Sequence, residues 1–439
     1  MAVSEFEFTL SGNTYFLKRY SGRAAKVVIP STYNGKPVTK ICREAFHDVY
    51  GVESIVVPDS VKAIESAAFS KCGMKSIKLS SKITKISDST FCDCRNLTSV
   101  AIPSGVKEIG ECAFIYCFNL KSVTIPVGVT SIGMRAFSKC KSLESVSIPD
   151  TVTNIDYYAF EECASLVSVK LSNRLTKLIA GLFQYCSSLK SVVIPSSVTS
   201  IGYNTFIGCA RLTSVTIPST VREIGSQAFS GCGFASFNIP AALTEIATGV
   251  FDGCKNLTAI TIPSNIKKIG AGAFSRCSSL TCVTLPNTVT EIGDGLFAEC
   301  TSLTSVTLGS SVTRITSRMF EKCENLSAVK LLGRLTNVGG YAFRGCKALS
   351  NFAVPDTVTS IGSGAFSECS GLHSVTIGRS VTCIGGSAFG SCWGLGSVKF
   401  TCSSGWCSGR GLVPVTVNFA DPAAAASYLK HRSPDLYRK

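Results

Sequence analysis

Cysteine is the residue type in this sequence with the widest chemical range, since thiolates bind metals, attack electrophiles and form disulfides. The chain has 439 residues and 22 cysteines, of which fifteen, from Cys72 to Cys392, stand three residues after a recurring phenylalanine. A zinc site would need clustered pairs such as C-x-x-C, which this regular file does not supply. We therefore expect this cysteine file to be a row of small buried thiols.

Seven cysteines fall outside the cysteine file: Cys42, Cys92, Cys112, Cys282, Cys383, Cys402 and Cys407. Only Cys402 and Cys407, in "CSSGWC", lie close enough together in a flexible segment to suggest a local disulfide. Whether that disulfide forms depends on the redox compartment of the protein.

Other catalytic residue types are sparse or out of context. The three histidines are His47, His373 and His431, one near each end and one between, which disfavours a dyad or a metal site. The "IGAGAF" and "IGSGAF" stretches imitate glycine-rich loops but lack the strand–loop–helix context of a phosphate site. We expect no enzymatic activity, no cofactor and no metal.

Lysines interrupt an otherwise uncharged strand pattern at four places, Lys78, Lys170, Lys330 and Lys399. Three of these have a second cation nearby, pairing Lys78 with Lys82, Lys170 with Arg174, and Lys330 with Arg334. One interpretation is a set of basic stations for anionic partners. The alternative is that each lysine only discourages edge-to-edge pairing of a polar β-surface.

A run of aromatic residues forms a second departure from the pattern: Tyr116, Phe118, Tyr157, Tyr158, Tyr185 and Tyr203. Most equivalent positions elsewhere are Ser, Lys, Gly or Glu. Exposed aromatic residues are enriched in protein interfaces, so this aromatic patch is a candidate binding surface. Ordinary packing of the loops explains the same residues equally well.

The elements that hold these residues repeat along the chain. The recurring phenylalanine occurs sixteen times, from Phe46 to Phe389, at intervals of 23 residues with two of 22. Each unit reads L-x-S-V-x-I-P-x-x-V-x-x-I-G-x-x-A-F-x-x-C. The alternating first half predicts a short strand, and the second half, with its Ala, Phe and Cys, predicts one tight helical turn. One such coil cannot bury its own apolar face, so neighbouring coils must stack.

This pattern resembles the BspA-like (treponemal) class of leucine-rich repeats over roughly residues 35–400. The resemblance implies an α/β solenoid of about sixteen 23-residue coils, with a parallel β-sheet on the concave face and short helical turns on the convex face. "FEFTLSGNTYFLKRY" predicts a capping hairpin within an N-terminal part, 1–34. Beyond the repeats, 401–439 is expected to contain an irregular linker and a capping helix that begins at Asp421 and Pro422.

Composition limits the class of protein. With 45% hydrophobic and 16% charged residues the chain is not disordered, and no apolar run is long enough for a membrane span. The N-terminus does not read as a signal peptide, so a cytoplasmic location stays open. The net charge of +15 is scattered, which makes nucleic acid an unlikely partner.

A non-enzymatic protein that binds macromolecules along an extended solenoid surface fits these features. The family resemblance implies a cell-surface or secreted adhesin whose partners are proteins, such as extracellular-matrix or serum glycoproteins including fibronectin and fibrinogen. An intracellular protein-interaction scaffold and a polyanion binder are the alternatives.

Overall fold

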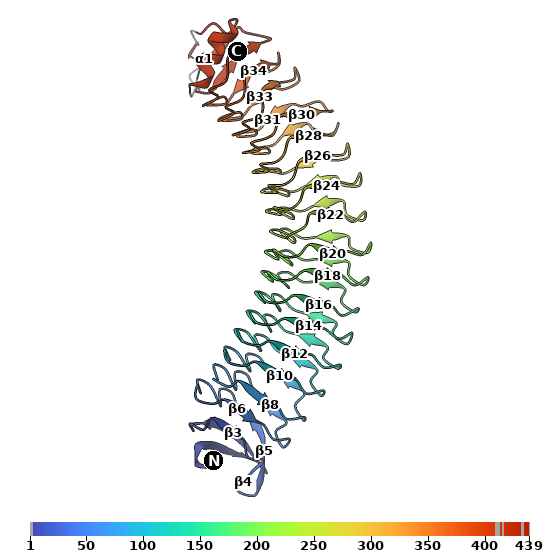
Figure 1. Cartoon of the computed structure of the whole chain (residues 1–439), viewed down its shortest axis with the longest axis vertical. Helices are drawn as coiled ribbons and strands as arrows, with labels where there is room; N and C mark the ends of the chain where they lie inside the picture. Colours follow the sequence, from blue (N-terminus) through green and yellow to red (C-terminus); the bar gives the residue numbers. More distant parts are fainter. Residues whose placement is uncertain (1–2, 409–412, 415–416, 432–433, 439) are drawn as a thin grey trace. The chain divides into compact units, whose positions relative to one another are not determined.

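The protein is a stack of short coils in chain order. The computed structural model describes residues 3–408, 413–414, 417–431 and 434–438. They fall into two compact units, unit 1 (Met1–Val221) and unit 2 (Arg222–Lys439). In each unit the coils lie one on the next with their strands side by side (Figure 1). The expected β-solenoid of 23-residue coils with parallel sheets is confirmed.

The first strand of each coil is the "SVT" segment, in which the central apolar residue is inside and its neighbours face out. In unit 1 these strands are β3 (Lys26–Val28), β6 (Ser54–Val56), β8 (Ser76–Lys78), β10 (Ser99–Ala101), β12 (Ser122–Thr124), β14 (Ser145–Ser147), β16 (Ser168–Lys170), β18 (Ser191–Val193) and β20 (Ser214–Thr216). In unit 2 they are β22 (Ser236–Asn238), β24 (Ala259–Thr261), β26 (Cys282–Thr284), β28 (Ser305–Leu308), β30 (Ala328–Leu331), β32 (Asn351–Ala353), β34 (Ser374–Ile377) and β36 (Ser397–Phe400). Equivalent residues pair in parallel register, as Ser99 does with Ser76 and Ser122. We call this surface the strand face.

Each coil has a second, shorter strand that the repeat pattern did not predict. In unit 1 these are β7 (Ala63–Ile64), β9 (Lys85–Ile86), β11 (Glu108–Ile109), β13 (Ser131–Ile132), β15 (Asn154–Ile155), β17 (Lys177–Leu178) and β19 (Ser200–Ile201). In unit 2 they are β21 (Glu223–Ile224), β23 (Glu245–Ile246), β25 (Lys268–Ile269), β27 (Glu291–Ile292), β29 (Arg314–Ile315), β31 (Asn337–Val338), β33 (Ser360–Ile361) and β35 (Cys383–Ile384). Two residues are too few for an alternating pattern to be seen in a sequence.

The segment around each repeat phenylalanine is a hydrogen-bonded turn, where the sequence suggested a helical one. In all sixteen coils the residues two before and two after this phenylalanine have φ between 54° and 72°. Left-handed residues cannot continue a right-handed helix, so the chain turns back at each of them. Only the short helices η1 (Val3–Glu5) and α1 (Pro422–Lys430) occur in the described part of the chain.

This alternation of backbone hand lets the turns hydrogen-bond to one another. In the coil of Phe91, the N–H groups of Ser89, Phe91 and Asp93 donate to carbonyls of the next coil, each at 2.8 Å. The acceptors are Glu111, Ala113 and Ile115. We call this row of bonds the turn ladder. It uses polar groups that the turns would otherwise leave without partners, which offsets the cost of the left-handed residues.

The glycine four residues before many of the repeat phenylalanines serves close approach between coils. A Cβ on Gly362 would lie 2.4 Å from the backbone nitrogen of Gly340 in the preceding coil. The equivalent distance for Gly339 is 2.6 Å, to the nitrogen of Ser317. Such contacts are far inside van der Waals range, so the "IG" motif marks where two coils touch.

The core of each unit is a column of stacked phenylalanine rings beside the cysteine file. From Phe46 to Phe206, neighbouring ring centroids are 5.0–5.8 Å apart. From Phe229 to Phe389, they are 5.0–6.2 Å apart. Every repeat phenylalanine and every thiol of the file is buried. Stacked rings bury large apolar area and gain from their mutual orientation.

The buried thiols act as hydrogen-bond donors between coils. Cys163 Sγ donates to the carbonyl of Phe137 at 3.2 Å, and Cys186 Sγ donates to that of Phe160 at 3.1 Å. Burial raises the pKa of Cys209 and of Cys254 to about 12. A small apolar side chain with one weak donor suits this site, because the carbonyl gains a partner at little cost in volume.

At the N-terminus, β1 (Phe6–Ser11) and β2 (Thr14–Tyr20) form an antiparallel hairpin. β2 pairs with β5 (Lys36–Ile41), which also pairs with β4 (Thr32–Tyr33). The Tyr20 ring stacks on Phe46 at 5.2 Å, and its N–H donates to the carbonyl of Ala45 at 2.8 Å. This hairpin therefore covers both the ring column and the first carbonyl of the turn ladder.

At the C-terminus, α1 and the strands β37 (Trp406–Ser408), β38 (Val413–Pro414) and β39 (Leu436–Arg438) follow the last coil. The Asp421 carboxylate caps α1, accepting from the N–H of Ala423 and Ala424. β37 and β38 lie inside the segment expected to be an irregular linker, and β37 is ordered by antiparallel pairing with β39. Positions 409–412, 415–416, 432–433 and 439 of the expected 401–439 part lie outside the described residues.

Candidate functional site

The aromatic patch lies on the surface formed by the turns, which we call the turn face. Tyr116, Tyr158 and Tyr185 occupy left-handed positions, with φ of 64°, 61° and 59°. Tyr116 and Tyr185 stand two residues after a repeat phenylalanine, and Tyr158 stands two before one. These backbone positions point away from the core, so the rings project outward.

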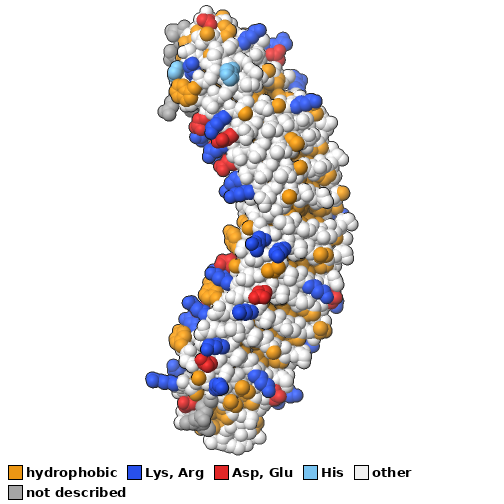
Figure 2. Space-filling model, viewed as in Figure 1, with side chains coloured by type: hydrophobic (Ala, Val, Ile, Leu, Met, Phe, Trp, Pro, Cys, Tyr) orange, Lys and Arg blue, Asp and Glu red, His pale blue; other side chains and the backbone are white. Residues whose placement is uncertain are grey.

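Exposure separates these residues from core aromatics. Tyr116, Tyr157, Tyr185 and Tyr203 are 36%, 41%, 47% and 49% exposed, whereas the neighbouring repeat phenylalanines are fully buried. Phe118 and Tyr158 are half-buried. Figure 2 shows hydrophobic and basic side chains alternating along the turn edge of unit 1.

Glycines in the following coil create room for two of the rings. A Cβ on Gly181 would lie 2.2 Å from the Tyr158 ring, and one on Gly208 would lie 2.3 Å from the Tyr185 ring. Each ring therefore lies against the backbone of the next coil. Burial is the main cause of the raised pKa of Tyr158. The charge of Tyr203 and a hydrogen bond with Tyr203 raise this pKa further. Tyr203 belongs to the coil beyond Gly181, so the missing side chain at Gly181 lets the two tyrosines meet.

Lysine and arginine side chains of neighbouring coils contact the rings of the aromatic patch. Lys139 Nζ lies 5.1 Å from the centroid of the Tyr116 ring, and the Arg135 guanidinium lies 5.3 Å from that of Tyr158. Phe118 has Lys141 at 5.1 Å and Arg95 at 5.5 Å from its centroid. Each contact contributes about 0.5–1 kcal/mol at an exposed site. The sequence analysis did not connect these cations with the aromatic residues, although each stands 23 residues from its partner.

Unit 2 repeats part of this arrangement around Tyr341, which the sequence analysis did not select. Arg318 lies 5.7 Å from the centroid of the Tyr341 ring, and a Cβ on Gly364 would lie 2.6 Å from that ring. The order Arg–Tyr–Gly at intervals of 23 residues thus occurs at 135, 158 and 181 and again at 318, 341 and 364. That spacing is the signal by which Tyr341 could have been found.

The structure places all the predicted basic residues on the surface but does not gather them into one site. Lys78, Lys170, Lys330 and Lys399 are exposed at the outer position of β8, β16, β30 and β36, and Lys82, Arg174 and Arg334 are exposed in the loops that follow the first three. Across the part of the chain that the structure describes, none of these seven forms an ion pair. β8 and β16 are four coils apart, or about 19 Å at the strand spacing.

Two of the stations lie near a carboxylate of the preceding coil. The Asp59 carboxylate accepts from the Ser81 N–H at 2.7 Å, and that bond is the main cause of its lowered pKa. The charges of Lys82 and Lys78 lower the pKa of Asp59 further, to a smaller extent. Asp150 has the same relation to Asn173 and Lys170. The two carboxylates therefore offset part of the positive charge of these lysines.

Cys402 and Cys407, for which the sequence left a local disulfide open, are both free in this structure. Cys407 is buried in β37, while Cys282 is the exposed member of the cysteines outside the file. Among the residues that the structure describes, no three His, Cys, Asp or Glu side chains are placed to hold a metal ion.

Comparison with known proteins agrees with this geometry. The model of the BspA type leucine rich repeat region matches residues 20–134, 107–234, 222–350 and 290–405. The chain belongs to this family. No curated protein sequence matches it significantly.

Solved structures of leucine-rich repeat proteins are similar over most of the BspA-type chain. A protein from Bacteroides ovatus is 29% identical, with a TM-score of 0.65, and the match covers 91% of this chain and 94% of that one. The pneumococcal vaccine antigen PcpA is 20% identical, with a TM-score of 0.50 and coverage of 83% and 93%. The latter likeness concerns the fold alone. In the described part of the BspA-type chain, no helix has the length and hydropathy of a membrane span.

Proposed function

We propose that this BspA-type protein binds macromolecular partners, above all proteins, through the aromatic patch of unit 1, and that it carries no enzymatic activity of its own. The observation that carries the proposal is the set of four tyrosines that are 36–49% exposed on one surface and interleaved with cations. Tyrosine and arginine are the residue types enriched at the energetic centres of protein interfaces.

The way the rings are held favours binding. The rings of Tyr158 and Tyr185 each rest on a glycine of the next coil, and the cations beside Tyr116 and Tyr158 restrict them further. A side chain that is already ordered loses little conformational entropy when a partner covers it. The Tyr185 ring uses one face for packing on Gly208, so packing and binding are compatible explanations of the exposed rings.

The partner class follows from the chemistry of the patch and from the family. Arg95, Arg135 and Lys139 pair with Asp93, Glu161 and Glu162, so the patch favours a partner segment with apolar side chains that cover the rings and a carboxylate that reaches Lys141. We propose that the protein acts at the cell surface or after secretion, as an adhesin for matrix or serum glycoproteins. An intracellular scaffold would use the same patch, and localisation of the full-length gene product separates these two settings.

We propose that the basic stations assist binding only by long-range electrostatic attraction. Lys78 and Lys170 are too far apart to contact one small ligand, and Lys330 belongs to unit 2, but each can attract an acidic partner over a Debye length. Replacing all three by Glu should slow association with an acidic partner, with the largest effect in low salt. Unchanged association rates would leave these lysines as protection against edge-to-edge pairing.

The proposal is tested by binding of the whole chain to immobilised fibronectin and fibrinogen, with surface plasmon resonance as the readout. The double variant Tyr157→Ala, Tyr203→Ala removes two exposed rings at ordinary backbone positions. We expect at least a tenfold loss of affinity for each ring, which corresponds to about 1.4 kcal/mol. The thermal unfolding midpoint should stay within a few degrees.

Tyr341→Ala in unit 2 is the matched control, because Tyr341 is 40% exposed and has the same type of arginine and glycine neighbours. It should leave binding unchanged. Failure of the native chain to bind either glycoprotein, or full binding by a correctly folded double variant, would refute the proposal as stated.

A further inference from the structure

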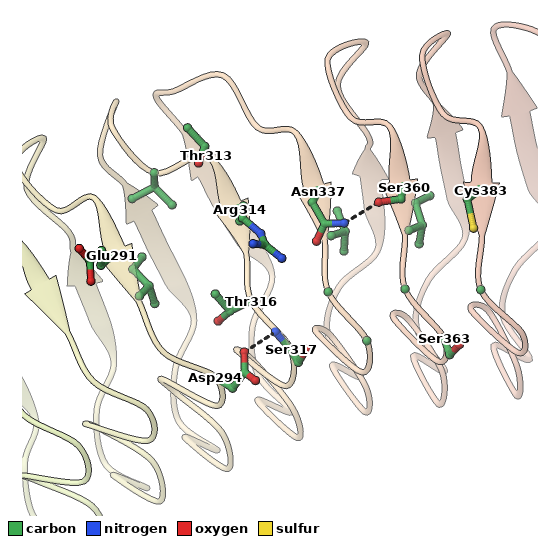
Figure 3. Close-up of a pocket in the computed structure, with 18 of the residues that line it drawn as sticks. Glu291, Asp294, Thr313, Arg314, Thr316, Ser317, Asn337, Ser360, Ser363 and Cys383 are labelled. Atoms are coloured by element: carbon green, nitrogen blue, oxygen red, sulfur yellow. Dashed lines mark hydrogen bonds between the residues drawn. The ribbon is translucent and has the colours of Figure 1, made fainter. Parts of the chain in front are cut away.

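Unit 2 contains a groove on the face formed by its second strands. The groove has a volume of about 720 Å³ and crosses five consecutive coils, from β27 to β35. Tyr437 and Asp435 lie at one end, where β39 pairs with β35. In Figure 3, polar side chains from successive coils line this face in a row. At the strand spacing, β27 and β35 are separated by about 19 Å.

Two neighbouring positions of the repeat are small in this groove. The first is the "IG" glycine, where Gly339 and Gly362 meet the backbone of the preceding coil. The second is the next residue, which is Ser317, Gly340 and Ser363 in successive coils. In unit 1 this second position holds larger residues, such as Met134, Tyr157 and Tyr203. Unit 1 has a smaller hollow on the equivalent face, of about 490 Å³, which Met134 and Tyr157 line at this position, so the small residues go with the larger volume in unit 2.

A carboxylate and a guanidinium stand side by side in the groove without pairing. Glu291 and Arg314 hold the same position in consecutive coils. At this position in other coils, Lys85 pairs with Glu108 at 2.8 Å, and Lys268 with Glu245 at 3.3 Å. In the described ranges, neither Glu291 nor Arg314 takes part in an ion pair. Both charged groups therefore have hydrogen-bonding capacity left for a ligand.

Further polar groups line the floor between these charges and Tyr437. Asn337 donates to Ser360 across neighbouring coils, and the Ser317 N–H donates to Asp294 at 3.1 Å (Figure 3). The apolar residues beneath, such as Val338 and Ile361, are buried and present no pocket. The lining thus offers donors and acceptors along its length, and more of its exposed surface is polar than apolar.

We propose that this groove binds a linear, uncharged oligosaccharide. Sugar hydroxyls donate and accept in alternation, which matches a row of serine, asparagine, carboxylate and guanidinium groups. The charged side chains Glu291, Asp294 and Asp435 outnumber Arg314, so an acidic glycan is repelled.

A cationic peptide is the rival ligand, and the groove suits it less well. The second strands that form the floor pair with their neighbours, so a peptide cannot add a strand here. Peptide side chains also bind through apolar anchor pockets, which this surface lacks. The inference concerns unit 2 and is independent of the aromatic patch in unit 1.

The test is isothermal titration of the full chain with cellohexaose, maltohexaose and xylohexaose, each offered up to about 1 mM. The variant Ser363→Tyr narrows the groove with a residue that the repeat accepts at the same position in Tyr157, where the equivalent hollow of unit 1 is smaller. Ser226→Tyr places the same ring at the equivalent position of a coil outside the groove. Arg314→Ala removes the guanidinium.

We expect one of the neutral hexasaccharides to bind, with affinity lowered at least tenfold by Ser363→Tyr and by Arg314→Ala and unchanged by Ser226→Tyr. Circular dichroism should report the same fold for all four proteins. Absence of binding by every neutral hexasaccharide, binding of an oligolysine peptide in their place, or equal affinity of native chain and Ser363→Tyr would each overturn the proposal.

Discussion

We predict that the cysteine file makes the stability of this protein fall steeply in alkaline solution. Unit 1 buries seven thiols of the file, each with its pKa raised chiefly by burial: Cys72, Cys94, Cys117, Cys140, Cys163, Cys186 and Cys209. An unfolded thiol ionises with a pKa near 9.0, whereas that of Cys209 in the folded chain is about 12. The folded state therefore holds more protons than the unfolded state between these values.

The sign and size of the effect follow from that difference. Stability from the protonated thiols is fully present below pH 9 and is lost as the pH rises toward the folded pKa values. Each thiol that is protonated at pH 10 in the folded state but ionised in the unfolded state makes the free energy of unfolding about 1.4 kcal/mol lower at pH 10 than at pH 8. Seven such thiols remove about 10 kcal/mol, which is comparable with the whole stability of an ordinary domain.

Urea unfolding followed by circular dichroism, under reducing conditions at pH 8, 9 and 10, measures this loss. Tyrosine and lysine side chains titrate in the same range, so a variant is needed to isolate the thiols. In Cys140→Ala, Cys163→Ala, Cys186→Ala, the loss between pH 8 and pH 10 should shrink by about 4 kcal/mol. The variant will be less stable at pH 8, since three buried hydrogen bonds and some packing are lost.

The reasoning fails if the native chain has the same free energy of unfolding at pH 8 and pH 10. It also fails if the triple variant loses as much stability over that range as the native chain does. Either result would mean that the thiols are not held protonated by burial in the fold.

Two further predictions concern other buried positions. With iodoacetamide at pH 8, mass spectrometry should find exposed Cys282 alkylated at least a hundredfold faster than buried Cys277 and Cys300. Burial hides these two thiols and raises their pKa. Comparable rates would show that the coils open readily. Gly362→Ala should lower the free energy of unfolding by about 1–3 kcal/mol, since its Cβ would lie 2.4 Å from the Gly340 nitrogen. The control Gly396→Ala, whose Cβ would have no atom within 4 Å, should change the free energy of unfolding by less than about 0.5 kcal/mol. Equal unfolding midpoints of the two variants in urea would disprove the contact.

Much of the coil could be predicted from the sequence because its inward positions repeat without exception at the repeat phenylalanine. Register, coil length and the parallel first strands follow from that repeat and from the alternation in "SVT". The second strands and the turn geometry could not be predicted, because two-residue strands and left-handed turns are set by contacts between coils. Residues as different as Tyr158, Glu162 and Gly181 adopt the left-handed turn positions.

The candidate surfaces were predictable to a different extent. The aromatic patch and the basic stations stand out as departures from the repeat, and both prove exposed. Their binding roles stay predictions, as does the division into 1–34, 35–400 and 401–439. The cation–ring contacts join residues 23 apart, such as Arg135 and Tyr158, and become visible only when neighbouring coils are compared position by position. The groove of unit 2 arises from small residues, which a search for reactive side chains passes over.

The turn ladder requires hydrogen-bond donors to cap it at the N-terminal end and acceptors to cap it at the C-terminal end. Because the turns within each unit donate toward the C-terminus, the first coil presents carbonyls and the last presents N–H groups. Tyr20 brings a donor to Ala45, and the Lys430 carbonyl brings an acceptor to Ser391, while beside the ladder Asp435 accepts from the Gly386 N–H. Whole coils can therefore be inserted or deleted by recombination, since each new junction joins the same complementary edges. The end pieces, by contrast, cannot be exchanged, and any shortened version of this protein needs its own acceptor-bearing terminus.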